Sequence, residues 1–225
     1  MYNSFYCKYI KRLLDIGFGS IGFIAFCISY IFVAPAIYFT DKGPVFYKAK
    51  RRGKRDKVFE MYKYRSMRVN APDLRNKDNT TYNAGDDPRV TKVGKILRAT
   101  SIDELPQFIN VLKGDMSLIG PRPNVPTPGL AYEDIPEDRK KRLQVKSGIT
   151  GYAQAYYRNS ASLEEKIKAD NYYVDNVSFA LDVKVFFKTI SRIFSHKGIY
   201  VSRKEGDELR TPMSAEEVKK ERTGK

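Results

Sequence analysis

An apolar run from Leu13 to Phe39, broken only by Asp15 and small residues, constrains this chain more than any other feature. The run is long enough for a helix to cross a bilayer core of ~30 Å. It is apolar nearly all round, which disfavours the core helix of a soluble protein. A signal peptide would show the same order of basic and apolar residues, but no convincing cleavage site precedes the polar turn. We therefore predict a membrane-inserted helix over residues 1–40.

Basic residues flank this apolar run at both ends. Lys8, Lys11 and Arg12 precede it, and a cluster from Lys48 to Arg52 follows it. A single span would place one of these clusters outside, against the positive-inside tendency. A re-entrant helix that enters and leaves on one face avoids this conflict, and Pro35 can kink it by removing a backbone hydrogen bond. An ordinary spanning helix is the alternative.

The size and charge of the chain limit its function classes. Its 225 residues suit one catalytic unit, and a net charge of +15 calls for an anionic partner. Nucleic acid, an anionic membrane or a phosphorylated substrate would each serve, and charge alone does not choose among them. Two cysteines, Cys7 and Cys27, imply no disulfide framework. With His196 as the one histidine, a zinc cluster or a His-based catalytic site is not expected.

The middle of the chain predicts short strands and helices. Residues 45–47 and 58–62 are strand-like and flank the basic turn 51–57, which predicts a β-hairpin. Residues 137–145 form a short charged helix, and 162–174 form a helix that starts with a capping box. The polar stretch 70–87 reads as a mobile loop that can act as a lid. The predicted class is α+β, with a catalytic domain over 41–202 and a loose charged tail over 203–225.

A helix over residues 179–194 carries an apolar stripe at steps of three and four residues. The stripe contains Phe179, Val183, Phe186, Phe187, Ile190, Ile193 and Phe194, whereas Lys184, Lys188 and Arg192 lie on the opposite side. A core-facing surface helix is the usual interpretation of such a stripe. Large aromatic residues opposite a cationic face equally suit an interfacial helix on anionic lipid. Because of the N-terminal anchor we favour the interfacial helix.

Two adjacent carboxylates, Asp103 and Glu104, stand at the start of another predicted helix. Leu105, Phe108, Ile109 and Leu112 recur at helical spacing, and Gly114 ends the helix. Ser101 is a good N-cap, and Glu104 three residues later completes a capping box. Glu104 alone can thus be explained by helix capping and by the favourable interaction of acidic residues with the helix dipole.

Cations on both sides of the carboxylate pair favour a second interpretation. Arg98 precedes the helix, and the segment Gly120–Pro123 that follows it contains Arg122. Arginine side chains and free helix N–H groups bind phosphate oxygens, while carboxylates hold Mg²⁺. The pattern suits a metal-bound phosphate.

The residues around this pair resemble the bacterial sugar transferase family, the monotopic phosphoglycosyl transferases. The resemblance rests on residues 101–107, 110–123 and 145–154, and continues to Arg158 and Asn159. It covers roughly residues 11–197. The family's re-entrant helix is broken at a Ser-Pro pair; here the corresponding place reads Ser29-Tyr30, and the proline comes later, at Pro35.

The resemblance implies transfer of a sugar-1-phosphate from a UDP-sugar to polyprenyl (undecaprenyl) phosphate, with release of UMP. This is the first membrane step of capsule, exopolysaccharide or glycoconjugate synthesis, on the cytoplasmic face of the bacterial inner membrane. Carried onto this chain, Asp103 is the nucleophile that forms a phosphosugar-aspartyl intermediate, and Asp103 and Glu104 hold Mg²⁺. The implied substrate-binding residues are Arg98, Arg122, Arg158, Lys63, Arg65 and Gln154.

Two non-enzymatic alternatives remain. A membrane-tethered nucleic-acid binder would explain the charge, but the cations are not gathered on one helix and no nucleic-acid-binding motif is present, so no nucleic-acid partner is expected. A scaffold for anionic lipid would explain the helices, but it gives no reason for the carboxylate pair among cations. The sugar, the pathway and the oligomeric state stay open.

Overall fold

A computed structural model describes residues 4–74, 82, 87–127, 130–157 and 161–195. Its helices are α1 (Lys11–Asp41), α2 (Lys92–Thr100), α3 (Gln107–Lys113), α4 (Glu137–Lys140), α5 (Tyr152–Tyr156), α6 (Leu163–Asn176) and α7 (Phe179–Ser195). Its strands are β1 (Phe46–Arg52), β2 (Val58–Tyr64), β3 (Met116–Ile119) and β4 (Ser147–Thr150). Short helical turns cover Tyr6–Ile10, Lys54–Asp56, Ile102–Glu104 and Lys141–Gln144. The mixture of helices and strands agrees with the predicted class.

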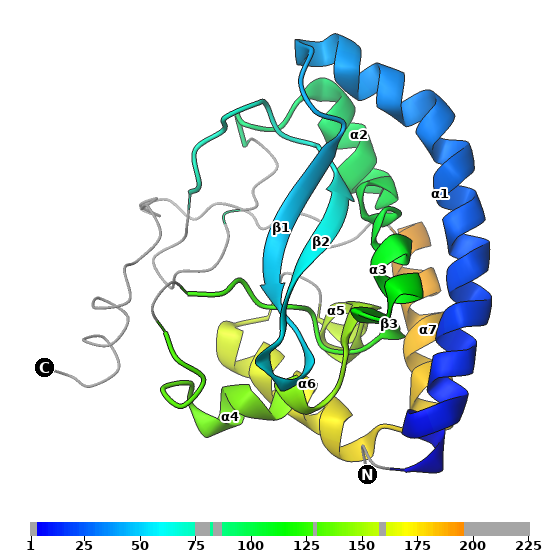
Figure 1. Cartoon of the computed structure of the whole chain (residues 1–225), viewed down its shortest axis with the longest axis vertical. Helices are drawn as coiled ribbons and strands as arrows, with labels where there is room; N and C mark the ends of the chain where they lie inside the picture. The colour runs from blue at the N-terminus through cyan, green and yellow to red at the C-terminus, as the bar shows by residue number, and fades with distance from the viewer. Residues whose placement is uncertain (1–3, 75–81, 83–86, 128–129, 158–160, 196–225) are drawn as a thin grey trace, which may run out of the picture.

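Helix α1 is continuous over 31 residues, with Pro35 inside it. The expected kink at Pro35 therefore does not interrupt the helix. In Figure 1, α1 runs along one side of the whole molecule, with α3 beside it and α7 in contact with it through Phe18 and Phe186. Gly22 permits this close approach, because a side chain there would overlap the ring of Phe108 on α3. The re-entrant path through a bilayer stays a prediction.

Both ends of α1 are tied to the rest of the protein. Near the first turn, Arg12 donates hydrogen bonds to the carbonyls of Val111 (2.7 Å) and Leu112 (2.9 Å) in the last turn of α3. At the last turn, Asp41 accepts two hydrogen bonds from the guanidinium of Arg65 (2.7 and 2.6 Å). A helix of this length spans about 46 Å. The globular part thus contacts α1 at both of its ends.

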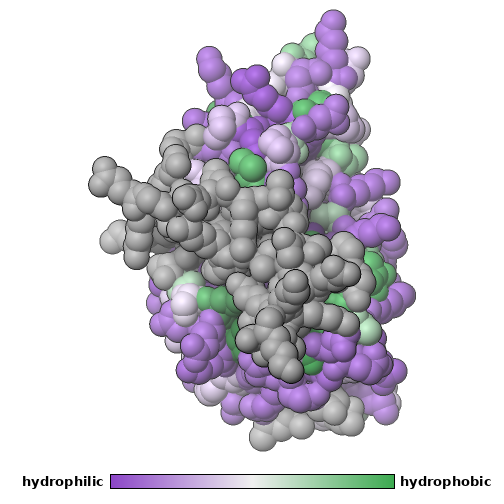
Figure 2. Space-filling view, turned by 90° about the vertical axis from the view of Figure 1, so that its left-hand side faces the viewer, coloured by the Kyte–Doolittle hydropathy of each residue, from purple (hydrophilic) through white to green (hydrophobic). Residues whose placement is uncertain are grey.

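The outward face of α1 is apolar and exposed, and it continues onto α7. This is the one helix in the described part of the chain that is long and apolar enough to cross a membrane. The ring of Phe18 on α1 lies 6.4 Å from that of Phe186 on α7. Exposed residues on α1 include Leu13, Ile16, Ile21, Ile24, Ile28, Ile31, Phe32 and Phe39. On the side of the molecule away from α1, by contrast, Figure 2 shows mostly hydrophilic residues where the surface is described.

The predicted aromatic stripe of α7 faces outward rather than into the core. Phe179, Phe186 and Phe187 are exposed, whereas Val185 and Asp182 are buried. Tyr173 donates a hydrogen bond to Asp182 (2.6 Å), and Lys11 forms an ion pair with the same carboxylate. The helix is confirmed, and the exposure of its aromatic residues agrees with the interfacial interpretation. Contact with lipid stays a prediction.

The predicted hairpin is confirmed, and it is longer than the sequence indicated. Strands β1 and β2 pair antiparallel from Phe46↔Tyr64 to Arg52↔Val58. Helix α3 docks on β2 through the buried Asn110, which donates to the carbonyl of Glu60 (2.6 Å) and accepts from the amide of Tyr62 (3.0 Å). This contact fixes the helix after the carboxylate pair against the strand that carries Lys63.

A second, parallel pair, β3–β4, was not predicted. Met116 pairs with Ser147, and Ile119 pairs with Thr150. Immediately after β3, Gly120 passes so close to Gly148 that a side chain on either residue would collide with backbone. The crossing determines where the following segment, which contains Arg122, leaves the sheet.

Several smaller predictions have clear outcomes. The capping box of α6 is present, with Ser162 as N-cap and Glu165 as its partner. The charged helix after Pro136 is α4 and the turn that follows it. Asp87, the last residue of the predicted polar loop, forms a buried ion pair with Arg89 (2.7 Å). Most of that loop, His196 and the tail 203–225 lie outside the described residues.

Candidate active site

Asp103 and Glu104 lie in a short 3₁₀ turn between α2 and α3, not inside one longer helix. The predicted capping box is wrong: the side chain of Ser101 makes no cap hydrogen bond, and Ser101 ends α2 with a φ of 59°. Pro106 explains the break, since proline lacks the N–H that a continuing helix needs; α3 starts at Gln107. Gly114 ends α3, as predicted. Glu104 is therefore free of a capping role.

The carboxylate of Glu104 instead binds two cations. Lys63 Nζ lies 2.6 Å and Arg122 Nη2 lies 2.9 Å from the same oxygen, Glu104 Oε1. Lys63 Nζ is also 3.9 Å from Asp103 Oδ2. These cations come from the end of β2 and from the segment after β3, so the fold brings together groups about 60 residues apart in sequence.

The two carboxylates have pKa values shifted in opposite directions. Burial raises the pKa of Asp103, and the negative charge of Glu104 adds to this against the lowering effect of Lys63. Burial would also raise the pKa of Glu104, but Arg122 and Lys63 together lower it well below its usual range. Glu104 thus stays a firmly ionised anchor for cations. Asp103 is the more basic carboxylate and so the better nucleophile in its ionised form.

Arg122 is positioned by a buried ion pair that the sequence did not reveal. Arg142 donates to the backbone carbonyl of Arg122 (2.6 Å) and to Asn124 Oδ1 (2.8 Å), and it pairs with Asp170 (2.7 Å). Asp170 is 2% exposed. In the sequence Arg142 lies in a charged segment that looks like a solvated helix face, so only the tertiary structure shows its inward role.

The other predicted site residues are placed as follows. Arg98 donates to Ser66 Oγ (2.9 Å), and its charge lowers the pKa of Asp103. Gln154 lies on α5, and neither polar atom of its buried amide has a hydrogen-bond partner in the structure as described. Arg65 is engaged by Asp41 and by the carbonyl of Pro44 (2.6 Å), which gives it a structural tie. Arg158 lies outside the described residues.

The carboxylate pair can supply the protein's share of a magnesium site. Over the described residues, no cluster of three or more His, Cys, Asp or Glu side chains forms a complete metal cage. Mg²⁺ is usually bound by one or two carboxylates together with substrate phosphates and water. Asp103 and Glu104 meet that requirement, and the neighbouring cations suit a diphosphate.

The family model for bacterial sugar transferases matches residues 6–196, which includes every element described above. The chain belongs to the bacterial sugar transferase family. The match extends from the turn before α1 to the end of α7, so the membrane-type helix is part of the family region.

Relatives of this sugar transferase include both short and long proteins. It is 40% identical over 195 residues to the uncharacterized sugar transferase EpsL of Bacillus subtilis, covering 84% of this chain and 90% of EpsL. It is 42% identical over 197 residues to the galactosyl transferase CpsE of Streptococcus agalactiae, covering 84% of this chain and 43% of CpsE. It is 39% identical over 195 residues to a UDP-glucose:undecaprenyl-phosphate glucose-1-phosphate transferase of Klebsiella pneumoniae, covering 84% and 41%. The chain thus spans under half the length of the last two.

Proposed function

We propose that this protein transfers a sugar-1-phosphate from a UDP-sugar to a polyprenyl phosphate and releases UMP. The observation that carries the proposal is the buried Asp103 beside Glu104, whose carboxylate holds Lys63 and Arg122 in place. A nucleophile of raised pKa next to two positioned cations suits attack on a diphosphate. The relatives' names support the same reaction, since one is a glucose-1-phosphate transferase that uses undecaprenyl phosphate.

The reaction we propose has two displacements at one phosphorus atom. A carboxylate oxygen of Asp103 attacks the β-phosphorus of the UDP-sugar, the bond from that phosphorus to the oxygen of UMP breaks, and UMP leaves. The sugar phosphate is then an acyl phosphate on Asp103. A phosphate oxygen of the polyprenyl phosphate attacks the same phosphorus, which restores the carboxylate and gives the polyprenyl diphosphate sugar. Splitting one difficult transfer into two steps is the advantage of covalent catalysis.

Charge in this reaction is handled by the residues around Asp103. Lys63 and Arg122 are held by Glu104 and can bind the diphosphate oxygens as the donor enters. Arg98 adds a further positive charge, which lowers the pKa of Asp103. When bound at Asp103 and Glu104, Mg²⁺ would stabilise the charge that develops on the leaving UMP.

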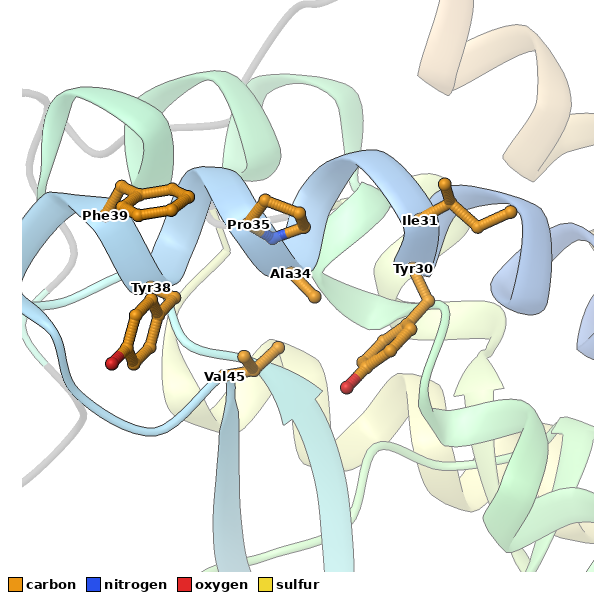
Figure 3. Close-up of a pocket in the computed structure, with 7 residues that line it drawn as sticks. All are labelled: Tyr30, Ile31, Ala34, Pro35, Tyr38, Phe39 and Val45. Carbon is orange, nitrogen blue, oxygen red and sulfur yellow. The ribbon is translucent and has the colours of Figure 1, made fainter.

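The membrane-type features fit a lipid acceptor. Helix α1 offers a long apolar face, and an apolar groove of about 490 Å³ lies between its C-terminal half and the start of β1. Figure 3 shows Tyr30 and Tyr38 on α1 on either side of Val45, with Pro35 above them. The groove lies at the end of the hairpin that carries Lys63, since Val45 immediately precedes the Phe46↔Tyr64 pair. We propose that α1 is re-entrant and holds the site at headgroup depth on the cytoplasmic face.

The experiment that tests this proposal is UMP release by the full chain in nanodiscs. Undecaprenyl phosphate, Mg²⁺ and a panel of UDP-sugars would be supplied, beginning with UDP-glucose and UDP-galactose because of the relatives' names. We expect release with one donor, and none after EDTA treatment.

A second measurement tests the covalent step. With the acceptor omitted, intact-protein mass spectrometry should show an adduct of one sugar phosphate, and Asp103→Asn should show neither adduct nor UMP. Continued turnover by folded Asp103→Asn would reject Asp103 as the nucleophile. Absence of release from every donor, in protein of native thermal stability, would favour the non-catalytic alternative.

A further inference from the structure

A small cationic cavity lies away from the carboxylate pair, at the other end of the hairpin. It has a volume of about 70 Å³ and lies between the hairpin turn, the end of α3 and the start of β4. Three of its lining residues are lysines, Lys54, Lys57 and Lys146, and one is an acid, Asp115. A single buried water needs roughly 10–15 Å³ of cavity volume. The cavity is several times larger, so it has room for a phosphate group.

Lys146 is the unusual member of this group. It is partly buried, and in the described part of the chain its ammonium makes no hydrogen bond or ion pair. Its pKa is lowered by burial and by the positive charges of Arg12 and Lys54, against the raising effect of Asp15 and Asp115. Lys146 Nζ and Arg12 Nη2 both lie 3.5 Å from the point where a side chain on Gly114 would begin. Two cations therefore converge on one place in a partly desolvated setting, where an unpaired charge is costly.

Two acids near the cavity, Asp115 and Asp15, act on Lys146 but balance the positive charges only in part. Asp115 pairs with Lys113 at 3.8 Å. Asp15 accepts hydrogen bonds from Ser117 Oγ and from the amide of Leu118, both at 2.9 Å. Arg12 donates hydrogen bonds to two carbonyls of α3, but these carbonyls are neutral and do not cancel its positive charge. The cavity thus keeps an excess of positive charge, which favours an anion with several oxygen acceptors.

We propose that the cavity beside Lys146 binds a phosphate group, and that its source is the headgroup of an anionic phospholipid. Its position supports the lipid source: Arg12 stands in the first turn of α1, where the exposed apolar face begins at Leu13. A phosphate held there would be at the level where the apolar helix meets the basic globular part. The site would anchor the start of α1 independently of the reaction at Asp103.

Binding of soluble short-chain lipids to the full chain in detergent tests this proposal. The probes are dioctanoyl phosphatidylglycerol, dioctanoyl phosphatidylcholine, which has the same phosphate with a compensating cation, and inorganic phosphate. The variants are Lys146→Met and Lys54→Met, with Lys168→Met as a control that also removes one positive charge, from an exposed side chain on α6. Lys54 is exposed, so its substitution should leave folding intact even if that of Lys146 does not.

We expect phosphatidylglycerol to bind more tightly than phosphatidylcholine. Lys146→Met and Lys54→Met should each weaken it about tenfold, as expected for one charge-assisted contact, and Lys168→Met should leave it unchanged. If the two substitutions weaken the binding of inorganic phosphate as much as that of phosphatidylglycerol, the cavity is a phosphate site, but its ligand is the free ion and not the lipid headgroup. Equal losses in all three variants would show only net-charge attraction and overturn the proposal. So would phosphatidylglycerol binding that neither Lys54→Met nor Lys146→Met changes. UMP release, measured in parallel, separates this result from the reaction.

Discussion

The Asp103–Glu104 turn and the cavity beside Lys146 differ in how their cations are paired. At the turn, Lys63 and Arg122 each form an ion pair with a carboxylate, whereas the carboxylates near Lys146 bind other groups. Glu104 binds both Lys63 and Arg122, so the positive charges of the candidate active site are positioned before any substrate arrives. Around Lys146 the acids Asp115 and Asp15 are bound to other groups. Lys63 and Arg122 are therefore positioned to bind the phosphate groups of a reacting substrate. The cavity beside Lys146 is suited only to anion binding.

The comparison also concerns how the cations are supported. Arg122 stands on a segment held by the buried Arg142–Asp170 pair, and it is itself partly exposed, with 47% of its side chain accessible. Lys54 and Lys57, by contrast, stand on the turn of a hairpin. Preorganised charges contribute most to catalysis, because they need not reorganise as the reaction proceeds. Arg122 is therefore supported through a buried ion pair, whereas Lys54 and Lys57 depend on the position of the hairpin turn.

Among the variants that test this difference between the two sites, Arg122→Met is expected to have the largest effect on activity. Loss of one preorganised donor should lower kcat/KM for the UDP-sugar by about 10²–10³-fold. Arg122→Lys, which keeps the charge but not the fork, should recover part of the loss. Initial rates of UMP release against donor concentration measure both variants. A loss below threefold for Arg122→Met would mean that Arg122 only neutralises Glu104.

A smaller loss is expected from Arg142→Gln, because Arg142 acts through Arg122. Misplacement of a charged group by about 1 Å can cost up to roughly 10²-fold, so we expect a loss of about 10- to 100-fold in kcat/KM. A double-mutant cycle tests the route of the effect. In an Arg122→Met background the Arg142→Gln substitution should have almost no further effect on kcat/KM. Additive losses would show that Arg142 acts by general destabilisation instead.

Particular residues show how far the sequence could predict this fold and site. The hairpin, the capping box at Ser162 and the apolar α1 depend on neighbours in sequence, and each was predicted correctly. The parallel pair β3–β4 and the Arg142–Asp170 contact join segments that only the tertiary fold brings together. The role of Glu104 was ambiguous for the same reason, since its partners Lys63 and Arg122 lie 41 and 18 residues away.

The acid side of the pH–rate profile should move in opposite directions in two variants. Asp103 must be ionised to attack, so activity falls as pH drops through its pKa, which burial has raised. Lys63 lowers that pKa, so Lys63→Met should move the acid limb to higher pH. Glu104 raises it, so Glu104→Gln should move the limb to lower pH. Profiles of kcat/KM for UMP release measure both, and shifts in the same direction would exclude Asp103 as the titrating group.

The smallest effect on activity is expected at Arg65, a cation that the sequence predicted to bind substrate. Its guanidinium is fully engaged by Asp41 and the carbonyl of Pro44, so it ties the end of α1 to the strand that carries Lys63. Arg65→Met should therefore change donor KM by less than about twofold, while loss of these charge-assisted bonds lowers the apparent unfolding temperature by about 5 °C. Asp41→Asn, on the partner side, should lower it in the same direction. A tenfold rise in donor KM without loss of thermal stability would instead place Arg65 with Arg122 among the phosphate-binding cations.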